Sequence, residues 1–262
     1  MSRTTDPARN GIVLLCGDFV ATRAIYAALA QKFGPVTVIV EDPLPRGELV
    51  RRRLRSQGFL RVVGQFLFLS VCLPLLRLQA ARRISQLEEQ LPLSPEFPHD
   101  VVRVPSVNSA EAREALIAAR PVVVIVSGTR IISQQTLGAV RVPFINMHSG
   151  ITPGYRGVHG GYWALVDRNP KDVGTTVHYI DAGIDTGEPI AFASFAPEPE
   201  DSFVTYPYLH TAAGLPLLIE AVSRALNGTL APTKRRRETQ SVLRSHPTIW
   251  EYLAHRLLHG VK

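Results

Sequence analysis

The chain has 262 residues, of which 45% are hydrophobic and 19% are charged, with 19 glycines and 20 prolines. This length allows one large or two small domains with a sizeable core, and the composition excludes disordered, collagen-like and coiled-coil chains. Two cysteines, Cys16 and Cys72, exclude a disulfide framework and a four-cysteine zinc site, and they fit a reducing compartment.

Neither a secretion signal nor a membrane span is expected. The first eleven residues, MSRTTDPARNG, contain no apolar core of the kind that directs secretion. The longest apolar run, FLFLSVCLPLLRL at 66–78, is shorter than the roughly 18–20 residues that cross a bilayer, and Pro74 and Arg77 interrupt it. The sequence therefore predicts a cytoplasmic protein.

The net charge of +7 is concentrated in one segment. Residues 46–83 hold nine arginines against a single acid, Glu48, so this segment carries +8 and the rest of the chain −1; a smaller basic run lies at 234–237. Charge gathered in this way does not favour a nucleic-acid partner, which a whole-surface field would attract. Three interpretations stay open for 46–83: solvated helices packed on the domain, a cationic lid for a diphosphate or glycan substrate, and, ranked lower, a weak contact with an anionic membrane.

Strand-like and helix-like segments alternate through the first half of the chain. Short apolar runs predict strands at 11–18, 36–42, 121–128 and 142–148, and helical spacing predicts helices at 22–34 and 109–120. A strand, a helix and a second strand in succession form a βαβ unit, which requires a parallel sheet. We therefore expect an α/β fold with an open, mostly parallel twisted sheet and helices on both faces. Ligands of such folds bind at the carboxyl ends of the strands.

The second half begins with a glycine-rich stretch at 150–161. Two strands around a glycine-rich loop are predicted at 174–195, and helices at 202–228 and near the end of the chain. No internal repeat or long linker divides the chain. We expect a single domain over 1–262, with a basic helical insertion at 45–92 and a helical C-terminal extension at 200–262.

Two short segments carry candidate catalytic residues. Asn146 and His148 are one residue apart at the end of a predicted strand, so their side chains face the same way. An amide can donate to a developing oxyanion, and a histidine can move a proton at neutral pH. Asp181 and Asp185 lie in a glycine-rich turn and could orient such a histidine. Each segment alone also fits a structural role, as a strand terminus or an ordinary hairpin turn.

Together, NMHSGITPGYRG (146–157) and GTTVHYIDAGIDTGEPI (174–190) resemble the core of the 10-formyltetrahydrofolate-dependent formyltransferase family. The resemblance is good over roughly 122–189 and loose over the first strand and helix. The positions in register with the family's motifs are Asn146, His148, Pro153, Tyr155, Arg156, Gly157, Gly174, Val177, His178, Asp185 and Gly187.

The resemblance implies a Rossmann-like formyltransferase core and a catalytic set. Asn146 would stabilise the oxyanion, His148 would accept or shuttle the amine proton, and Asp185 would hold His148, with no metal required. The 10-formyltetrahydrofolate co-substrate would lie against Ser127, Gly128, Thr129, Arg130, Ile131, Ile132, Ile180 and Asp181. The amine substrate would meet Tyr155, Arg156, Gly157 and His159. We expect His178, which alternates with Val177 on a strand, to face away from the site.

Two differences between this sequence and other members of the family limit the choice of amine substrate. CGDFVATR at 16–23 replaces the glycine-rich phosphate loop of glycinamide ribonucleotide enzymes, and only 73 residues follow Pro189, where tRNA-formylating enzymes carry a nucleic-acid-binding barrel. We therefore favour sugar N-formyltransferases, acting on a nucleotide-linked amino sugar. Glycinamide ribonucleotide, hydroxyornithine or aminoacyl-tRNA as acceptor, a formyl-folate hydrolase, and a non-enzymatic RNA- or membrane-binding protein stay as alternatives. A homodimer also stays open.

Overall fold

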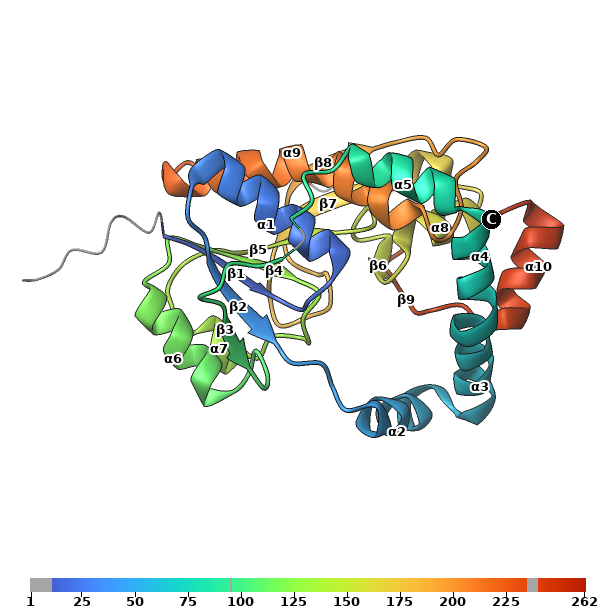
Figure 1. The fold of residues 1–262 in the computed structure, drawn as a ribbon, viewed down its shortest axis with the longest axis horizontal. Coiled ribbons are helices and arrows are strands. Elements are labelled where there is room, and N and C mark those ends of the chain that lie inside the picture. Colours follow the sequence, from blue (N-terminus) through green and yellow to red (C-terminus); the bar gives the residue numbers. More distant parts are fainter. Residues whose placement is uncertain (1–10, 95, 235–239) are drawn as a thin grey trace, which may run out of the picture.

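The computed structural model describes residues 11–94, 96–234 and 240–262. Residues 1–10, for which no secretion signal is expected, and most of the basic run at 234–237 lie outside these residues. The described chain forms an elongated body with the sheet at one end and a helical arm at the other (Figure 1).

A seven-stranded sheet organises the fold, in the order β3-β2-β1-β4-β5-β7-β8. The first five of these strands are parallel, and β7 and β8 complete the sheet as antiparallel strands. The predicted open, mostly parallel sheet is confirmed. The strands are β1 (Ile12–Cys16), β2 (Thr37–Glu41), β3 (Val102–Val104), β4 (Val123–Ser127), β5 (Phe144–His148), β7 (Gly174–Tyr179) and β8 (Pro189–Ser194).

Helices cover both faces of the sheet because the central strands are apolar on both sides. Alternate residues of β1 divide between two cores: Ile12 and Leu14 pack with helices α1 (Val20–Phe33) and α9 (Tyr206–Leu226), and Val13 and Leu15 pack with α6 (Ala110–Ala119). The short helix α7 (Gln134–Leu137) lies beside α6 (Figure 1). The chain leaves β1 for β2 on one side and meets β4 on the other, so a ligand cleft is expected at the ends of β1 and β4.

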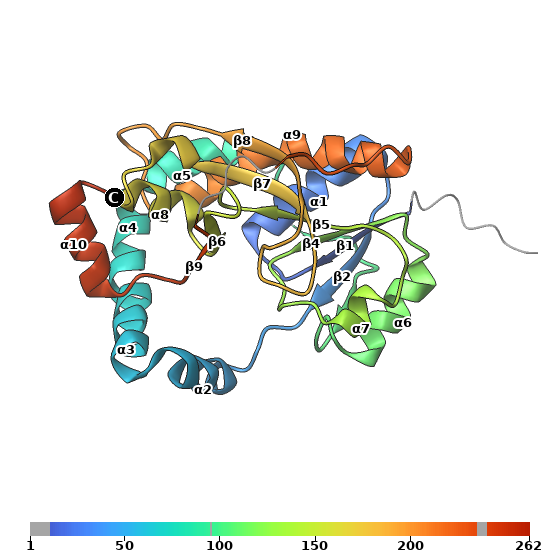
Figure 2. The ribbon, with the colours of Figure 1, turned by 180° about the vertical axis from the view of Figure 1, so that it is seen from behind.

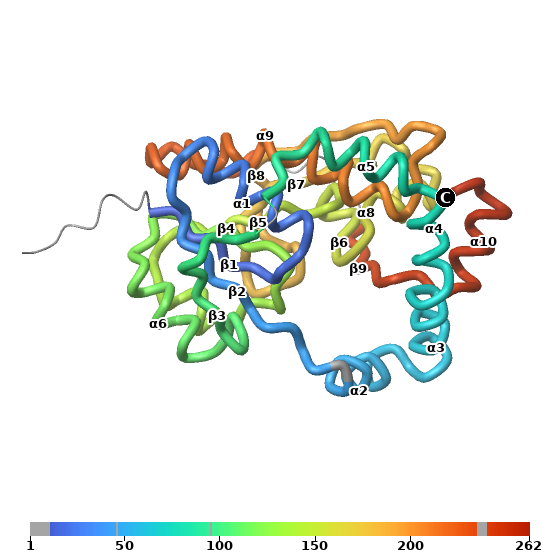
Figure 3. The backbone as a smooth tube through the Cα atoms, viewed as in Figure 1, coloured from blue at the N-terminus to red at the C-terminus, as the bar shows by residue number. Residues whose placement is uncertain are grey.

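Between β2 and β3 the chain makes a long helical excursion away from the sheet (Figure 3). Its elements are α2 (Arg46–Gln57), α3 (Phe59–Leu67), a π-helical turn η1 (Phe68–Cys72), α4 (Leu73–Gln79) and α5 (Ala81–Glu89). The stretch Phe59–Gln79 is long and apolar enough to cross a membrane by length and composition, and most of it is not buried. The expectation that no segment reaches this length is therefore wrong: the π turn precedes Pro74, so the helix continues through the proline.

The C-terminal part packs against this excursion. Helix α10 (Ile249–His259) runs alongside α3 and α4 in both views (Figures 1 and 2). A second sheet of two strands, β6 (Tyr155–Gly157) and β9 (Val242–Arg244), joins segments far apart in the sequence. Together with α8 (Gly160–Val166) these elements enclose a third apolar core that includes Phe68, Tyr162 and Tyr252.

Candidate active site

A cavity of about 1160 Å³ opens at the carboxyl ends of the parallel strands. The residues that directly follow β1 and β4 form one wall of the cavity. The end of β5 and the loop between β7 and β8 form its floor. The opposite wall comes from α2 and α3, together with β9. The cavity therefore lies where a sheet of this order binds its ligands.

Asn146 and His178 meet at the floor of the cavity. They are paired across the antiparallel strands β5 and β7, and Nδ2 of Asn146 lies 3.2 Å from Nε2 of His178. Nδ1 of His178 lies 2.7 Å from the Tyr179 carbonyl, which can only accept, so His178 donates there and its Nε2 accepts from Asn146. The expectation that His178 faces away is wrong, because directly paired residues of antiparallel strands share one face.

His148 is fixed at both ring nitrogens. Nε2 donates to the Tyr155 carbonyl at 2.6 Å, and Nδ1 lies 3.4 Å from Oδ2 of Asp185. This approach depends on Gly150, because a Cβ there would lie 2.8 Å from Nε2 of His148 and closer still to the Tyr155 oxygen. A residue with no side chain at 150 therefore lets the loop carbonyl reach the imidazole.

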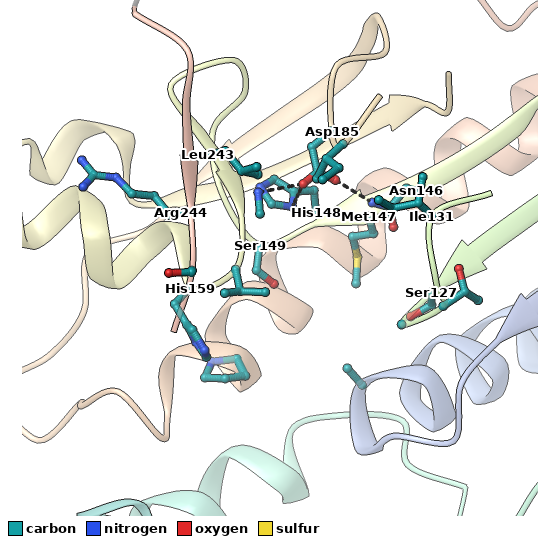
Figure 4. A pocket seen from close by; sticks show the side chains of 18 of the residues that line it. Ser127, Ile131, Asn146, Met147, His148, Ser149, His159, Asp185, Leu243 and Arg244 are labelled. Carbon is teal, nitrogen blue, oxygen red and sulfur yellow. Dashed lines mark hydrogen bonds and ion pairs between the residues drawn. The ribbon is translucent and has the colours of Figure 1, made fainter. Parts of the chain in front are cut away.

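Asp185 joins the parts of the site. Its Oδ1 lies 3.5 Å from Nδ2 of Asn146 (Figure 4). The same oxygen lies 3.6 Å from Nε2 of His178, and Oδ2 accepts from the Gly157 amide at 2.8 Å. Asp185 itself has a positive φ of 51°, a strained conformation that aims its carboxylate at the floor of the cavity. The predicted proximity of Asp185 to His148 is thus observed.

Burial and charge act on these groups in opposite directions. Burial lowers the pKa of His148, and the nearby Asp185 carboxylate opposes this by stabilising the imidazolium. Burial raises the pKa of Asp185, but the charge of a protonated His148 and the hydrogen bond from the Gly157 amide favour the carboxylate, and the pKa falls to about 2. The pair therefore consists of a firmly ionised carboxylate beside an imidazole that can exist neutral at neutral pH.

All eight residues expected to contact folate line this cavity: Ser127, Gly128, Thr129, Arg130, Ile131, Ile132, Ile180 and Asp181. These side chains differ in how accessible they are to a ligand. Ile131 is 57% exposed, whereas Ile132 is buried. The guanidinium of Arg130 is engaged elsewhere, 3.0 Å from Glu41 and 2.8 Å from the Pro105 carbonyl, so its charge serves the fold.

The four residues expected to contact the amine separate into two pairs. Gly157 and His159 line the cavity. Tyr155 and Arg156 are not among its lining residues: the ring of Tyr155 is buried in the third core, and Arg156 donates to the Ile184 carbonyl at 3.1 Å. The side chain of Arg156 thus ties its strand to the loop that carries Asp185, while the ring of Tyr155 anchors the same strand in the third core. The expectation that these two residues contact substrate directly does not fit this geometry.

The sequence offered a cationic lid at 46–83 as one interpretation, but it assigned no individual residue to the far wall of the cavity. Arg53, Arg61 and Gln65 come from the helical excursion, and Arg244 comes from β9. Gln65 is 1% exposed; its amide nitrogen donates to Gln57 and to the His246 carbonyl at 2.8 Å, but its Oε1 has no hydrogen-bond partner. Apart from the arginine content of 46–83, nothing in the local sequence marks these residues, because tertiary packing brings them to the site.

Three more histidines border the cavity in neutral form. Nε2 of His159 lies 2.9 Å from Nδ1 of His246, and the ring of His159 packs on Phe203. Burial lowers the pKa of all three, to about 3 for His210 and about 4 for His246, and well below the usual range for His159. Within the described chain, no group of three His, Cys, Asp or Glu side chains is arranged to hold a metal ion.

Sequence comparison gives relatives that match about half of the chain. The methionyl-tRNA formyltransferase of Koribacter versatilis is 34% identical over 125 residues, which are 47% of this chain and 40% of that protein. The enzyme of the same name from Caldanaerobacter subterraneus is 29% identical over 132 residues, 50% of this chain and 42% of that protein. The chain thus matches about two fifths of the length of these relatives.

Solved structures share the fold along most of the chain. A sugar N-formyltransferase from a Shewanella species has a TM-score of 0.54 at 15% identity, covering 87% of this chain and 75% of that one. Phosphoribosylglycinamide formyltransferase from Anaplasma phagocytophilum has a TM-score of 0.56 at 16% identity, covering 90% and 98%. An N-formyltransferase from Helicobacter canadensis, solved with folinic acid and dTDP-3-aminofucose, has a TM-score of 0.53 at 16% identity, covering 89% and 70%. At these identities the likeness shows the fold alone.

The family follows from the sequence itself. The profile of the formyl transferase family matches residues 79–222, more than half of the chain, and this stretch contains the strand that carries Asn146 and His148 and the loop that carries Asp185. The chain belongs to the formyl transferase family.

Proposed function

We propose that this protein transfers a formyl group from 10-formyltetrahydrofolate to the primary amine of a small molecule, a nucleotide-linked amino sugar. The observation that carries the proposal is the convergence of Asn146, His148 and Asp185 on the floor of one large cavity, in a chain of the formyl transferase family.

In this reaction the amine nitrogen forms a bond to the formyl carbon, and the bond from that carbon to N10 of the folate then breaks. The amine loses a proton and N10 gains one. Negative charge gathers on the formyl oxygen while the carbon is tetrahedral. The side-chain amide of Asn146 is the hydrogen-bond donor for this oxygen. One hydrogen of its Nδ2 is donated to His178, and the other has only a long contact, 3.5 Å, with Asp185. This second hydrogen can therefore turn to the oxyanion.

His148 and Asp185 act on the proton. Because Nε2 of His148 already donates to Tyr155, the nitrogen that changes protonation is Nδ1, beside Asp185. The amine proton passes to Nδ1, directly or through water, and the ionised Asp185 stabilises the imidazolium until the proton moves on to N10. Asp185 is itself held by the Gly157 amide, so the pair is oriented before substrate arrives.

The two walls of the cavity suit two different molecules. The wall at 127–132 offers backbone amides and the exposed Ile131, which fit the polar edge and flat face of a folate ring. The opposite wall supplies Arg53 and the unpartnered Oε1 of Gln65, whereas Arg61 and Arg244 on the same wall are ion-paired with Glu251 and Asp167. Guanidinium groups favour phosphate oxygens and a carbonyl oxygen accepts from hydroxyls, so this wall fits a sugar joined to a diphosphate. The Helicobacter canadensis structure, solved with such a nucleotide sugar and a folate, supports the same choice.

A glycinamide ribonucleotide acceptor is disfavoured by the loop after β1. The aromatic ring of Phe19 lines the cavity there and packs against the backbone of Gly17 and Gly128, in the region where the related enzymes cradle a phosphate. An aminoacyl-tRNA acceptor has support from the names of the partial-length relatives, and it belongs in the test as a competitor.

The test is an acceptor panel with 10-formyltetrahydrofolate as donor: amino sugars linked to dTDP or UDP, glycinamide ribonucleotide, hydroxyornithine and methionyl-tRNA. Mass spectrometry should find one formyl group added to a nucleotide sugar, and none with His148→Ala protein. Formylation of another acceptor would overturn the assignment of a sugar substrate but would still support formyl transfer as the reaction. Release of formate without any acceptor would identify a hydrolase and overturn the transfer.

A further inference from the structure

The helix Phe59–Gln79 leaves one apolar face uncovered. Its buried side carries Gly64, Gln65, Phe68 and Leu76, which turn toward the body of the protein. Its other side exposes large apolar residues along its whole length, from Phe59 (70% exposed) through Phe66 (65%) to Leu78 (76%). The exposed members of this apolar stripe are Phe59, Leu60, Phe66, Leu67, Val71, Leu75 and Leu78. An apolar surface of this length is a mark of an interaction site.

This helix is long enough to cross a bilayer, but its connections keep both of its ends on one side. The chain enters the excursion from β2 and returns to β3, and these strands are hydrogen-bonded neighbours, with Ile39 paired to Val102. A helix spanning the membrane would place β2 and β3 on opposite sides and break the sheet. The stripe can therefore lie along a surface but cannot pass through it.

Positive charge flanks the stripe at both ends. Arg51, Arg52 and Arg55 are exposed on α2 before it, and Arg77 and Arg82 are exposed at its far end. The described acid near the first group is Glu48, which pairs with Arg52. A partner that covers this face must present apolar groups to the stripe and negative charge to the flanking arginines. An anionic bilayer surface has both properties.

Helix α10 extends the same region. The indole of Trp250 packs against Gly64 of α3 while remaining 47% exposed, and Leu253 and Leu257 of α10 are exposed beyond it. Tryptophan favours the boundary between headgroups and acyl chains because its ring is apolar and its N–H is polar.

We infer that the helix Phe59–Gln79 docks the protein in the plane of an anionic lipid membrane, with the apolar stripe inserted and the flanking arginines on the headgroups. A second copy of the chain fits this face less well. A symmetric dimer would bring the two +8 segments together, and like charges brought face to face oppose association. This inference does not depend on the formyl transfer reaction.

The experiment is flotation of the full-length protein with phosphatidylcholine vesicles, with and without phosphatidylglycerol. We expect at least tenfold more protein bound to the anionic vesicles, less binding at high salt, and a blue shift of Trp250 emission in a Trp163→Phe background. Phe66→Asp with Leu78→Asp, and separately Arg51→Glu with Arg55→Glu, should each lower binding tenfold or more. Their matched controls, Ile117→Asp on exposed α6 surface and Arg141→Glu, should bind as the parent does.

Circular dichroism and thermal unfolding verify that each variant is folded. Equal binding by the stripe variants and their controls, or no flotation with either vesicle, would overturn the inference. A dimer in light scattering that the stripe variants convert to a monomer, without vesicle binding, would overturn it in favour of a second copy.

Discussion

Asn146 and His178 face each other across β5 and β7, with Nδ2 of the amide 3.2 Å from Nε2 of the imidazole. Since His178 accepts one amide hydrogen, it decides which way the Asn146 side chain turns. This makes His178 a positioning residue for the oxyanion donor.

Replacing His178 tests that role. Asn146→Ala should lower kcat by about 10²–10³, the usual effect of losing one oxyanion donor. His178→Leu should lower kcat in the same direction but less, with little change in KM, because the amide remains but is no longer oriented. His178→Gln, whose side-chain carbonyl can accept the same hydrogen, should recover part of the loss in steady-state assays. Equal kcat for the Leu and Gln variants would show that His178 only fills space.

His148 and Asp185 should behave as one unit. His148→Ala and Asp185→Ala should each reduce the single-turnover rate strongly, and the double variant should fall little further, because losing either member already removes the proton-transfer pair. Binding of a folate analogue, measured by calorimetry, should survive all three changes. Additive losses in the double variant would mean that the two residues act separately.

The pH profile should report His148. Burial lowers its pKa below the usual value near 6.5, so the acidic limb of kcat/KM should lie below about pH 6.5. Asp185→Asn removes the charge that partly restores this pKa and should move the limb to still lower pH, at a much reduced rate. A limb that stays in place or rises in the Asn variant would assign it to another group.

Gly150 should be indispensable for the orientation of His148. In Gly150→Ala the new Cβ would press on the Tyr155 carbonyl and on Nε2 of His148, 2.8 Å away, so one of them must move. We expect activity to fall far more than the melting temperature. Gly47→Ala, where nothing lies within 4 Å of the added carbon, is the matched control and should leave activity unchanged.

Acid should destabilise the fold through its buried histidines. The pKa of His210 is about 3 and that of His246 about 4, against about 6.5 in an unfolded chain, because burial disfavours the charged form. Below pH 6.5 these histidines are therefore protonated in the unfolded chain but remain neutral in the folded chain. The free energy of unfolding should drop by about 1.4 kcal/mol per pH unit for each such histidine until its folded-state pKa is reached.

Urea unfolding between pH 7.5 and 5 measures this slope. His210→Gln should make it shallower by the share of one histidine, and His99→Gln, at an exposed position, should leave it unchanged. An unaltered slope in the His210 variant would show that this residue takes up a proton in the folded state.

The sequence predicts the elements whose signal is local. The strands at Ile12–Cys16 and Val123–Ser127 are continuous apolar runs, and the motif around Asn146 and Asp185 carries the family resemblance. The side of the strand on which His178 lies was mispredicted, because it depends on the pairing of β5 with β7 and on an irregularity in the neighbouring ladder at Val177 and His178. The arginines at 46–83 allowed a cationic lid as one interpretation. The meeting of Arg61 and Arg244 on one wall of the cavity could not be predicted, since only the packing of the excursion against β9 and α10 brings them together.

The pairing of Ile12 with Val123 has a consequence for how the chain folds. These neighbours at the centre of the sheet are more than a hundred residues apart in sequence, so the sheet cannot close during synthesis until the whole helical excursion has emerged. Phe68 is covered still later in synthesis, because Tyr252, which packs on it, belongs to α10 near the end of the chain. A nascent chain, or one shortened before α10, therefore exposes part of the buried side of this helix in addition to its apolar stripe, and we expect it to need a chaperone or to aggregate.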